Sequence, residues 1–282
     1  MPPNSTWWGD RKRLQDMHIV VCIKQVIDPE IPPQVFQIDP VTRKQIRGTQ
    51  ALVISTFDEC ALEVALRQKE KTGSKVTALM IAGQEGAEAL RHAIAMGVDE
   101  AIQVSDPAFE DSDSFGKAHI LAAALRKLGQ FDLVLCGRQA GDVEMGLVGP
   151  FLAEEMSLPL VALAGNIELA DSKLKVKRPI EGGYAILETP MPCLMTVTND
   201  ESNVPRYASI RGIRQAMKRT VPVWSAADLG LDVSGLGAQA ARIQIDELFI
   251  PQRQVRCEFI CGESGAELGE RLALRLRELK LI

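Results

Sequence analysis

The sequence has no long hydrophobic run, and we expect no secretory leader. No stretch reaches the roughly 18 consecutive apolar residues that a membrane-spanning helix needs, so we expect no membrane span. Residues 1–16 are polar apart from Trp7 and Trp8, and they hold no apolar signal-peptide core. We treat these residues as an extension outside the fold and expect a cytoplasmic protein.

The sequence also lacks a surplus of basic residues and a cluster of cysteines. Its net charge is -5, so nucleic acid is not expected as a partner, because contacts to phosphate need an excess of Lys and Arg. Six cysteines are scattered over 282 residues, which argues against a disulfide scaffold and favours a reducing compartment. Cys257 and Cys261 have no second Cys or His pair nearby, so no metal site is expected.

What the sequence does contain is an alternation of apolar runs and helical patterns. Hydrophobic residues make up 46% and charged residues 24%, as in ordinary globular proteins. Short apolar runs predict buried strands at residues 18–24, 75–83, 101–104 and 131–136. Apolar residues at helical spacing predict helices at residues 57–71, 87–96 and 115–128. Asp113 is the expected N-cap of the third helix, and Gly97 ends the second.

This order of elements predicts an α/β fold with a mostly parallel sheet covered by helices on both faces. Ligands of such sheets bind beyond the carboxyl ends of the strands. That rule gathers Cys22, residues 81–83 and the loop that starts at Gly137 around one crevice.

Beyond Pro159 the pattern changes to short strands separated by turn residues. We expect a hairpin-rich continuation of the same domain, with strands at residues 161–169, 173–178, 184–188 and 193–197. Residues 199–220 are polar and basic with weak periodicity. Residues 266–279 predict a last helix whose leucines form an apolar stripe, suited to a core or a subunit interface.

Residues 132–159 carry the strongest functional signal. An apolar strand leads into a loop with several glycines and then into a helix at residues 151–156. The start of a helix offers free N–H groups and partial positive charge, which α/β proteins use to bind phosphate. A purely structural connection has the same pattern. Asp142 and Glu144 could be a general acid/base pair, but no nucleophile motif accompanies them. A role for Asp142 in helix capping or in contact with a ribose is therefore favoured over catalysis.

Six strings, in order from about residue 17 to residue 218, resemble the β subunit of electron-transfer flavoproteins. They are HIVVCIKQVID, STFDECALEVALRQKE, LRHAIAMGVDEAI, DLVLCGRQAGD followed by VGP, VKRPIEGGYAILETPMPCLMTV and VPRYASIRGIRQAMK. The first is similar to the family's first strand, the fourth to its nucleotide loop, and the last to the segment that recognises electron-transfer partners.

The resemblance implies an adenine-nucleotide-binding α/β domain, HUP-like and Rossmann-like, over residues 17–229, with the recognition loop at about residues 199–220. Residues 230–282 would form a C-terminal arm that contacts a partner subunit. That partner is an α subunit holding most of an FAD, and this chain would bind a second nucleotide, AMP or FAD. The heterodimer would carry electrons between dehydrogenases, or NADH, and an acceptor. No catalytic residue is expected in this chain, and flavin chemistry that oxidises NADH is expected only if its nucleotide is FAD.

Carried over by position, the resemblance places the nucleotide site in four segments. Their residues are Cys22; Ser55, Thr56, Phe57 and Asp58; Ile81, Ala82 and Gly83; and Gly137, Arg138, Gln139, Ala140, Gly141, Asp142, Val143, Glu144, Met145, Gly146, Leu147 and Val148. Leu147 stands where the family usually has Gln, and Ser55-Thr56 replace Asn-Pro. Val143 and Met145 are apolar where polar residues are common.

A partner-docking surface is expected in the last of the six strings. Ile210 occupies the anchor position that Leu usually holds, surrounded by Arg206, Tyr207, Arg211 and Arg214. An aliphatic anchor ringed by cations suits an acidic partner surface.

Two questions stay open at the level of sequence. The string EGGYAILETP is more similar to the nitrogen-fixation and anaerobe-type branch of the family than to the mitochondrial type. This similarity favours FAD over AMP as the nucleotide, and with it electron bifurcation. The alternative function is an ATP-using or nucleotide-sensing protein on the same adenine-binding fold. An ATP-using enzyme would need a pyrophosphate loop where this chain has KQVIDPE, and a sensing protein would not need residues 176–197.

Overall fold

The computed structural model describes residues 17–42, 44–170, 173–251 and 257–282. The extension expected at residues 1–16 lies outside these described residues. The chain divides into two compact units, residues 1–246 and residues 247–282, and each unit is described by itself.

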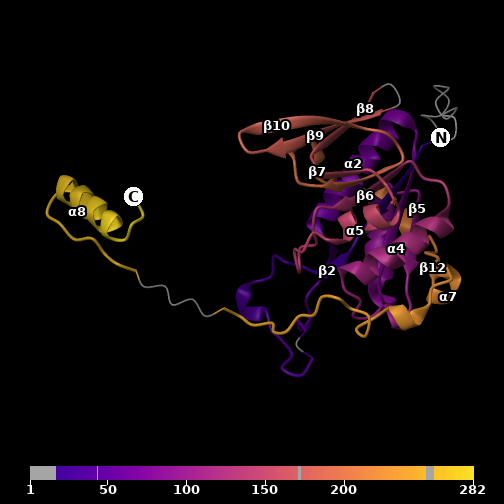
Figure 1. Ribbon diagram of the computed structural model, residues 1–282, viewed down its shortest axis with the longest axis horizontal. Helices are drawn as coiled ribbons and strands as arrows, with labels where there is room; N and C mark the ends of the chain where they lie inside the picture. Colours follow the sequence, from indigo (N-terminus) through magenta and orange to yellow (C-terminus); the bar gives the residue numbers. More distant parts are fainter. Residues whose placement is uncertain (1–16, 43, 171–172, 252–256) are drawn as a thin grey trace. The chain divides into compact units, whose positions relative to one another are not determined.

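A seven-stranded parallel sheet forms the centre of the first unit (Figure 1), in the order β12-β5-β4-β1-β6-β11-β7. Every pairing in it is parallel. Its strands are β1 (His18–Cys22), β4 (Lys75–Ile81), β5 (Glu100–Val104), β6 (Leu133–Gly137), β7 (Leu160–Ala164), β11 (Cys193–Val197) and β12 (Val223–Trp224). The predicted α/β class with a mostly parallel sheet is confirmed.

Helices cover both faces of this sheet, which explains why its inner strands are mostly apolar and carry no regular alternation of polar residues. On β1, Ile19 and Val21 pack into the core beneath α2 (Thr56–Thr72) and α3 (Ala87–Met96). Val20 and Cys22 point the other way, into the core beneath α4 (Ser114–Leu128) and α5 (Val148–Glu155). Successive strand residues therefore serve opposite cores.

The helix boundaries follow the predicted signals. The Asp113 side chain accepts a hydrogen bond from the Gly116 N–H, as an N-cap residue does. Gly97 follows the last residue of α3 with a φ of 131°, a backbone conformation that favours glycine. Both predictions are confirmed: Asp113 caps the start of α4, and Gly97 follows the end of α3.

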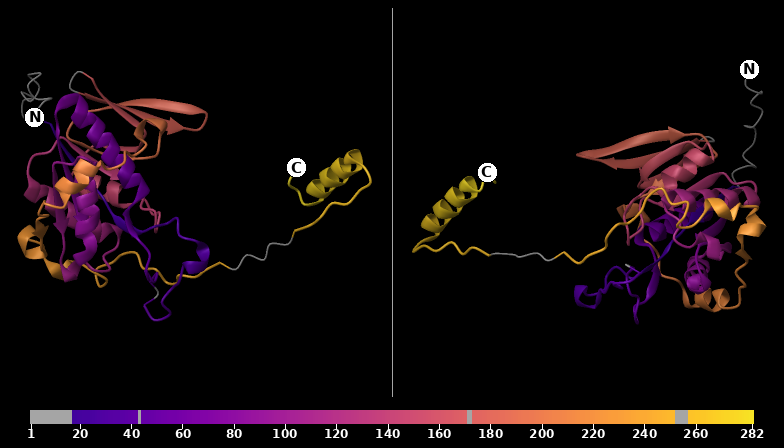
Figure 2. Two further views of the ribbon diagram at one scale, coloured as in Figure 1. Left: turned by 180° about the vertical axis from the view of Figure 1, so that it is seen from behind. Right: turned by 60° about the horizontal axis from the view of Figure 1, so that its bottom comes forward.

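A separate three-stranded antiparallel sheet stands beside the main one (Figure 2). Its strands are β8 (Asn166–Ala170), β9 (Lys173–Ile180) and β10 (Gly183–Thr189). The single strand expected at residues 161–169 is thus two strands, broken at Gly165. A Cβ on Gly165 would lie 3.2 Å from the Lys177 carbonyl oxygen, so the bend depends on the close approach of β9.

Short elements complete the first unit. Strands β2 (Gln25–Ile27) and β3 (Leu52–Ile54) form a small antiparallel pair. The remaining helices are α6 (Ile210–Ala216) and α7 (Ala226–Leu229), with 3-10 turns at Pro33–Val35, Gln84–Gly86, Pro107–Phe109, Glu201–Asn203 and Val233–Gly235. The α6 helix lies inside the stretch for which the sequence shows only weak periodicity.

The second unit contains α8 (Gly265–Glu278), close to the predicted range of 266–279. In the described part of the chain, none of the residues of α8 is buried. Leu272, Leu274 and Leu279 are each about half exposed. No helix in the described residues is long and apolar enough to cross a membrane.

Candidate functional site

A pocket opens at the carboxyl edge of the main sheet, where β1, β4 and β6 end. Its lining comes from these strand ends, from one face of α4 and from the loop between β6 and α5. The lining residues are Cys22, Ile23, Lys24, Asp58, Ile81, Ser114, Lys117, Leu121, Cys136, Gly137, Arg138, Gln139, Ala140, Val143, Met145, Gly146, Leu147, Val148 and Gly149.

Two cysteines form part of the pocket floor. Cys22 on β1 pairs in register with Cys136 on β6, and both are buried. The hydrogen bond between the two thiols and their burial raise the pKa of Cys136 well above its ordinary value. Both conditions favour a neutral thiol at Cys136, so this part of the floor offers an apolar, polarisable surface to a ligand.

Asp58, in the first turn of α2, ties three elements together beneath the pocket. Its two carboxylate oxygens accept hydrogen bonds of 2.8 Å from the backbone N–H groups of Gly137 and Lys24. Burial raises the pKa of Asp58 to about 7, although both hydrogen bonds oppose that rise. Asp58 therefore supports the strand ends and is the most strongly perturbed carboxyl group beside the pocket.

Close backbone packing shapes the loop that follows β6. A Cβ on Gly137 would lie 2.5 Å from Asp58 Oδ1 and 2.8 Å from the Phe57 carbonyl carbon, so only glycine fits. Gly146 has a φ of 65°, in the left-handed region that glycine adopts readily. These glycines let the loop backbone lie close to the pocket, as a phosphate-binding loop requires.

Side chains hold the rest of the loop in place. Lys24 Nζ lies 2.5 and 2.7 Å from the Asp142 carboxylate oxygens, and the Gly141 N–H donates to Ser55 Oγ at 3.1 Å. Asp142 also accepts from the Val143 N–H. The expected alternative of helix capping is not seen, because α5 has Leu147 at its N-cap position.

Two cationic side chains at the pocket have unused hydrogen-bonding capacity. Lys117 on α4 makes no ion pair or side-chain hydrogen bond within the described residues, and burial lowers its pKa. Arg138 stacks over Phe57 with its Cζ 4.6 Å from the ring centroid, and its buried Nε has no partner among the described atoms. Unpaired, partly desolvated cations are costly unless an anion binds beside them. The pocket therefore fits the phosphate of a nucleotide.

The first turn of α5 adds main-chain donors to the same side of the pocket. Its N-cap, Leu147, makes no side-chain cap hydrogen bond, so the N–H groups of the first turn have no cap within the described residues. Together with Gly146 and Arg138 they form a cradle suited to negative charge.

Most of the residues expected at the nucleotide site line the pocket, and the others support it from behind or lie beside it. Those outside the lining are Ser55, Thr56, Phe57, Ala82, Gly83, Gly141, Asp142 and Glu144. Ser55, Phe57 and Asp142 act on lining residues through the contacts given above. No functional role was expected for Lys24, Ser114, Lys117 or Leu121. Lys24 is the last residue of the strand expected at residues 18–24, and this position near Cys22 was the only signal for it.

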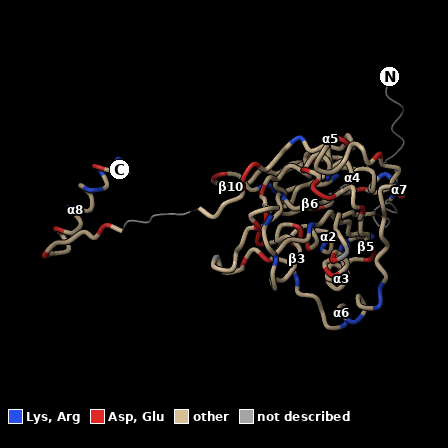
Figure 3. Tube along the Cα trace, turned by 90° about the horizontal axis from the view of Figure 1, so that it is seen from below, with Lys and Arg blue, Asp and Glu red and all other residues tan. Residues whose placement is uncertain are grey.

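The expected docking residues divide into two groups. Tyr207 is 99% and Ile210 80% exposed, and Arg211 and Arg214 are also exposed, on or directly before α6. Figure 3 shows Lys and Arg along the segment around α6. Arg206 instead binds Glu63 and Glu70 on α2, so its guanidinium is already engaged within this chain.

Comparison with known proteins agrees with this geometry. A family profile described as the electron transfer flavoprotein domain matches residues 45–229. The chain is similar to the electron transfer flavoprotein subunit beta of Thermoanaerobacterium thermosaccharolyticum, with 39% identity over 92% of this chain and 99% of the relative. It is 36% identical to the caffeyl-CoA reductase-Etf complex subunit CarD of Acetobacterium woodii, over 94% of this chain and all of the relative. Protein FixA of Azorhizobium caulinodans is 34% identical, over 83% of this chain and 85% of the relative.

Proposed function

The chain belongs to the electron transfer flavoprotein family as a β subunit, and from this membership we propose that its pocket binds the adenosine and phosphate part of FAD or AMP. Proteins of this family carry electrons as heterodimers, so the chain carries electrons together with an α subunit. The observation that carries the proposal is a pair of cations with free donors, Lys117 and the Nε of Arg138, beside a loop whose Gly137 has no room for a side chain.

Each part of the pocket has a proposed role in holding the nucleotide. Lys117, Arg138 and the N–H groups at the start of α5 neutralise phosphate. Cys22, Cys136 and Ile81 at the strand ends support the flat adenine ring. Asp58 keeps Gly137 and Lys24 in position and does not need to touch the ligand.

Of the two nucleotides, we favour FAD. Val143 and Met145 are about half exposed at the pocket, and exposed apolar side chains of this size suit the ring system that FAD has beyond its adenine half and AMP lacks. The resemblance of this chain to CarD and FixA supports the same choice. Bound FAD would supply the capacity to accept and donate electrons, including from NADH, as electron bifurcation requires.

The exposed group around Ile210 is the proposed docking surface for electron-transfer partners. Tyr207 and Ile210 offer apolar area, and Arg211 and Arg214 add positive charge. The proposed partner is an acidic-rimmed flavoprotein that acts on CoA thioesters, in line with the caffeyl-CoA reductase named for the relative CarD. The second unit, with the exposed leucines of α8, is the proposed arm that contacts the α subunit. A cytoplasmic location remains part of the proposal.

Analysis of nucleotides tests this proposal. The chain is produced together with its α subunit, the complex is denatured, and the released nucleotides are separated by chromatography and identified by absorbance. Two FAD per heterodimer supports the FAD assignment, and one FAD with one AMP supports AMP in the pocket. An intact heterodimer that releases only one nucleotide in total contradicts nucleotide binding by this chain.

A further inference from the structure

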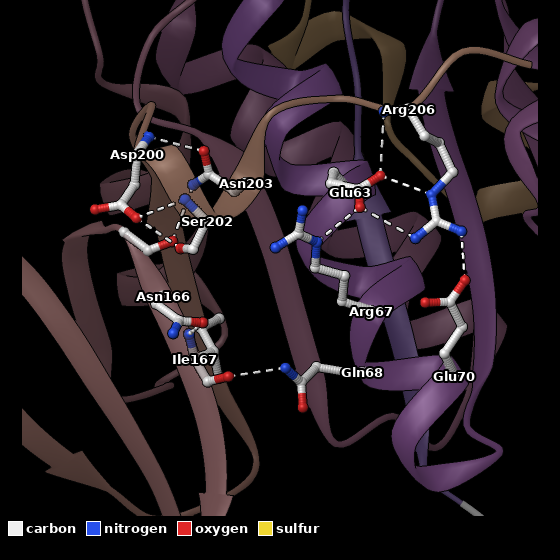
Figure 4. A network of polar contacts seen from close by, with 11 residues as sticks. Glu63, Arg67, Gln68, Glu70, Asn166, Ile167, Asp200, Ser202, Asn203 and Arg206 are labelled. Carbon is white, nitrogen blue, oxygen red and sulfur yellow. Dashed lines mark hydrogen bonds and ion pairs between the residues drawn. The ribbon is translucent and has the colours of Figure 1, made fainter.

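A buried carboxylate on α2 holds the beginning of the segment that carries the docking surface. Glu63, whose side chain is only 4% exposed, accepts three hydrogen bonds from Arg206 (Figure 4). They come from the guanidinium Nε at 2.7 Å, from Nη2 at 3.1 Å and from the backbone N–H at 3.2 Å. Glu63 therefore fixes the main chain at this point as well as the side chain.

Neighbouring charges on the same helix complete the network. Arg67 Nε donates to Glu63 Oε1 at 2.8 Å, and Arg206 Nη1 donates to Glu70. Burial alone would raise the pKa of Glu63, but the hydrogen bonds from Arg206 and Arg67 hold it below its ordinary value. Glu63 thus stays ionised over the physiological pH range and binds Arg206 as a charged pair.

The residues that follow Arg206 have little apolar anchorage of their own: Ala208 packs partly buried against the core, whereas Tyr207 and Ile210 are largely exposed. A further fixed point is on α6, where a Cβ on Gly212 would lie 2.2 Å from the Ala95 carbonyl oxygen of α3. The exposed apolar residues lie between these two anchors, and the first anchor is the ion pair with Glu63.

This arrangement differs from an ordinary surface ion pair. Exposed pairs contribute roughly 0–1 kcal/mol and leave the backbone free. Here one carboxylate is buried, receives four hydrogen bonds from two arginines, and binds a backbone N–H as well as a side chain. Loss of one partner from such a buried pair leaves a desolvated charge, which favours release of the segment into water.

We propose that Glu63 is a positioning residue for electron-transfer docking. By binding Arg206, Glu63 fixes the main chain against α2 and so sets the direction in which the following residues, 207–217, run. That direction determines how Tyr207 and Ile210 are presented to a partner. This inference rests on the proposed docking function of that segment. Glu63 does not touch the partner, and Arg206, which was expected to do so, acts through its bond to Glu63.

The test uses the intact heterodimer and a CoA-thioester dehydrogenase from which the wild-type heterodimer accepts electrons. The KM for the heterodimer and kcat are measured separately, with nucleotide content as a third readout. Glu63→Gln keeps the size of the side chain but loses its charge. We expect it to raise KM by about tenfold or more, with nucleotide content unchanged and kcat nearly so.

Matched variants separate positioning from general destabilisation. Glu70→Gln removes the exposed partner of the same arginine and should raise KM by much less. If Glu63→Gln does not assemble with the α subunit, Arg206→Lys, which keeps the charge but not the forked geometry, should give an intermediate rise in KM.

The outcomes distinguish this inference from the function on which it rests. An unchanged KM for Ile210→Ala shows that the surface does not dock partners, and both proposals then fail. If Ile210→Ala raises KM and neither Glu63→Gln nor Arg206→Lys does, only the positioning role of Glu63 is overturned. Equal rises for Glu63→Gln and Glu70→Gln also contradict it, since that result would reflect surface charge.

Discussion

The carboxylate of Asp58 accepts a 2.8 Å hydrogen bond from the backbone N–H of Gly137. This contact joins the first turn of α2 to the last residue of β6, which belong to the second and fourth of the six strings that resemble the family. The other oxygen of Asp58 holds Lys24 after β1. One buried side chain thus connects the segments that form the floor of the proposed nucleotide pocket.

Asp58→Asn should change how stability depends on pH. The pKa of Asp58 in the folded protein is about 7, above its ordinary value of 3.8, so folding favours the protonated form. Protonated Asp58 therefore contributes to the free energy of unfolding. This contribution, on the order of 4 kcal/mol, is fully present below about pH 4 and is lost as the pH rises through about 7.

Melting temperatures of wild-type and Asp58→Asn heterodimers, compared from about pH 5 to pH 8, measure this effect. As the pH rises, the melting temperature of the variant should increase relative to that of the wild type, because asparagine has no charge to bury. Parallel curves for the two proteins would show that Asp58 does not titrate in this range.

Gly137→Ala should destabilise the protein and weaken nucleotide retention. The added methyl group would lie within 2.8 Å of two backbone atoms of α2, so helix and strand must separate. We expect a loss of about 1–3 kcal/mol, visible as a lower melting temperature. Gly141→Ala is the matched control, because its Cβ would only contact Pro29 at an ordinary 3.8 Å. Similar losses for both variants would contradict the proposed tight packing.

Lys117→Met should weaken nucleotide binding while leaving the nucleotide-free protein as stable as before or more stable. The lysine is partly desolvated without a counterion in the described residues, and its charge is useful only when phosphate is bound. Nucleotide loss on dialysis should increase about tenfold or more. Lys127→Met, on the same helix but bonded to the Asp228 carbonyl, should retain nucleotide normally. Equal retention by both variants would place the phosphate elsewhere.

Ile210→Ala should slow electron delivery without loss of nucleotide. The side chain is 80% exposed, so its removal changes the surface and leaves the core intact. Loss of a central apolar contact corresponds to about 1–3 kcal/mol, or roughly a five- to hundredfold rise in KM for the partner. Ile186→Ala, an exposed isoleucine on β10, is the control. Release of flavin from Ile210→Ala would instead indicate a role in cofactor binding.

Much of the fold was predictable because its signals are local. The strand ranges followed from runs of residues such as Ile19 to Val21, which are buried on both faces of the sheet and so are apolar without interruption. The Asp113 cap and the Gly97 ending are properties of single residues at helix ends. The α6 helix was missed because most of its residues are exposed; Ala216 is its one buried residue, so it has almost no apolar stripe to detect.

The candidate site was only partly predictable, because several of its parts depend on contacts between distant segments. Lys117 lies in the first turn of a helix and shows its role only where the start of α4 lies beside the end of β6. The break at Gly165 requires the approach of β9, which follows later in the chain. Arg206 looked like a docking cation because sequence does not reveal Glu63, which lies 143 residues away in the chain.

The leucines of α8 have a consequence for how much of this protein a cell retains. In the described part of the second unit no residue of α8 is buried, so a chain without its α subunit would display these leucines to solvent. Chaperones and proteases recognise such exposed apolar helices. We therefore expect surplus β chains to be degraded and the two subunits to accumulate in equal amounts, even when their rates of synthesis differ.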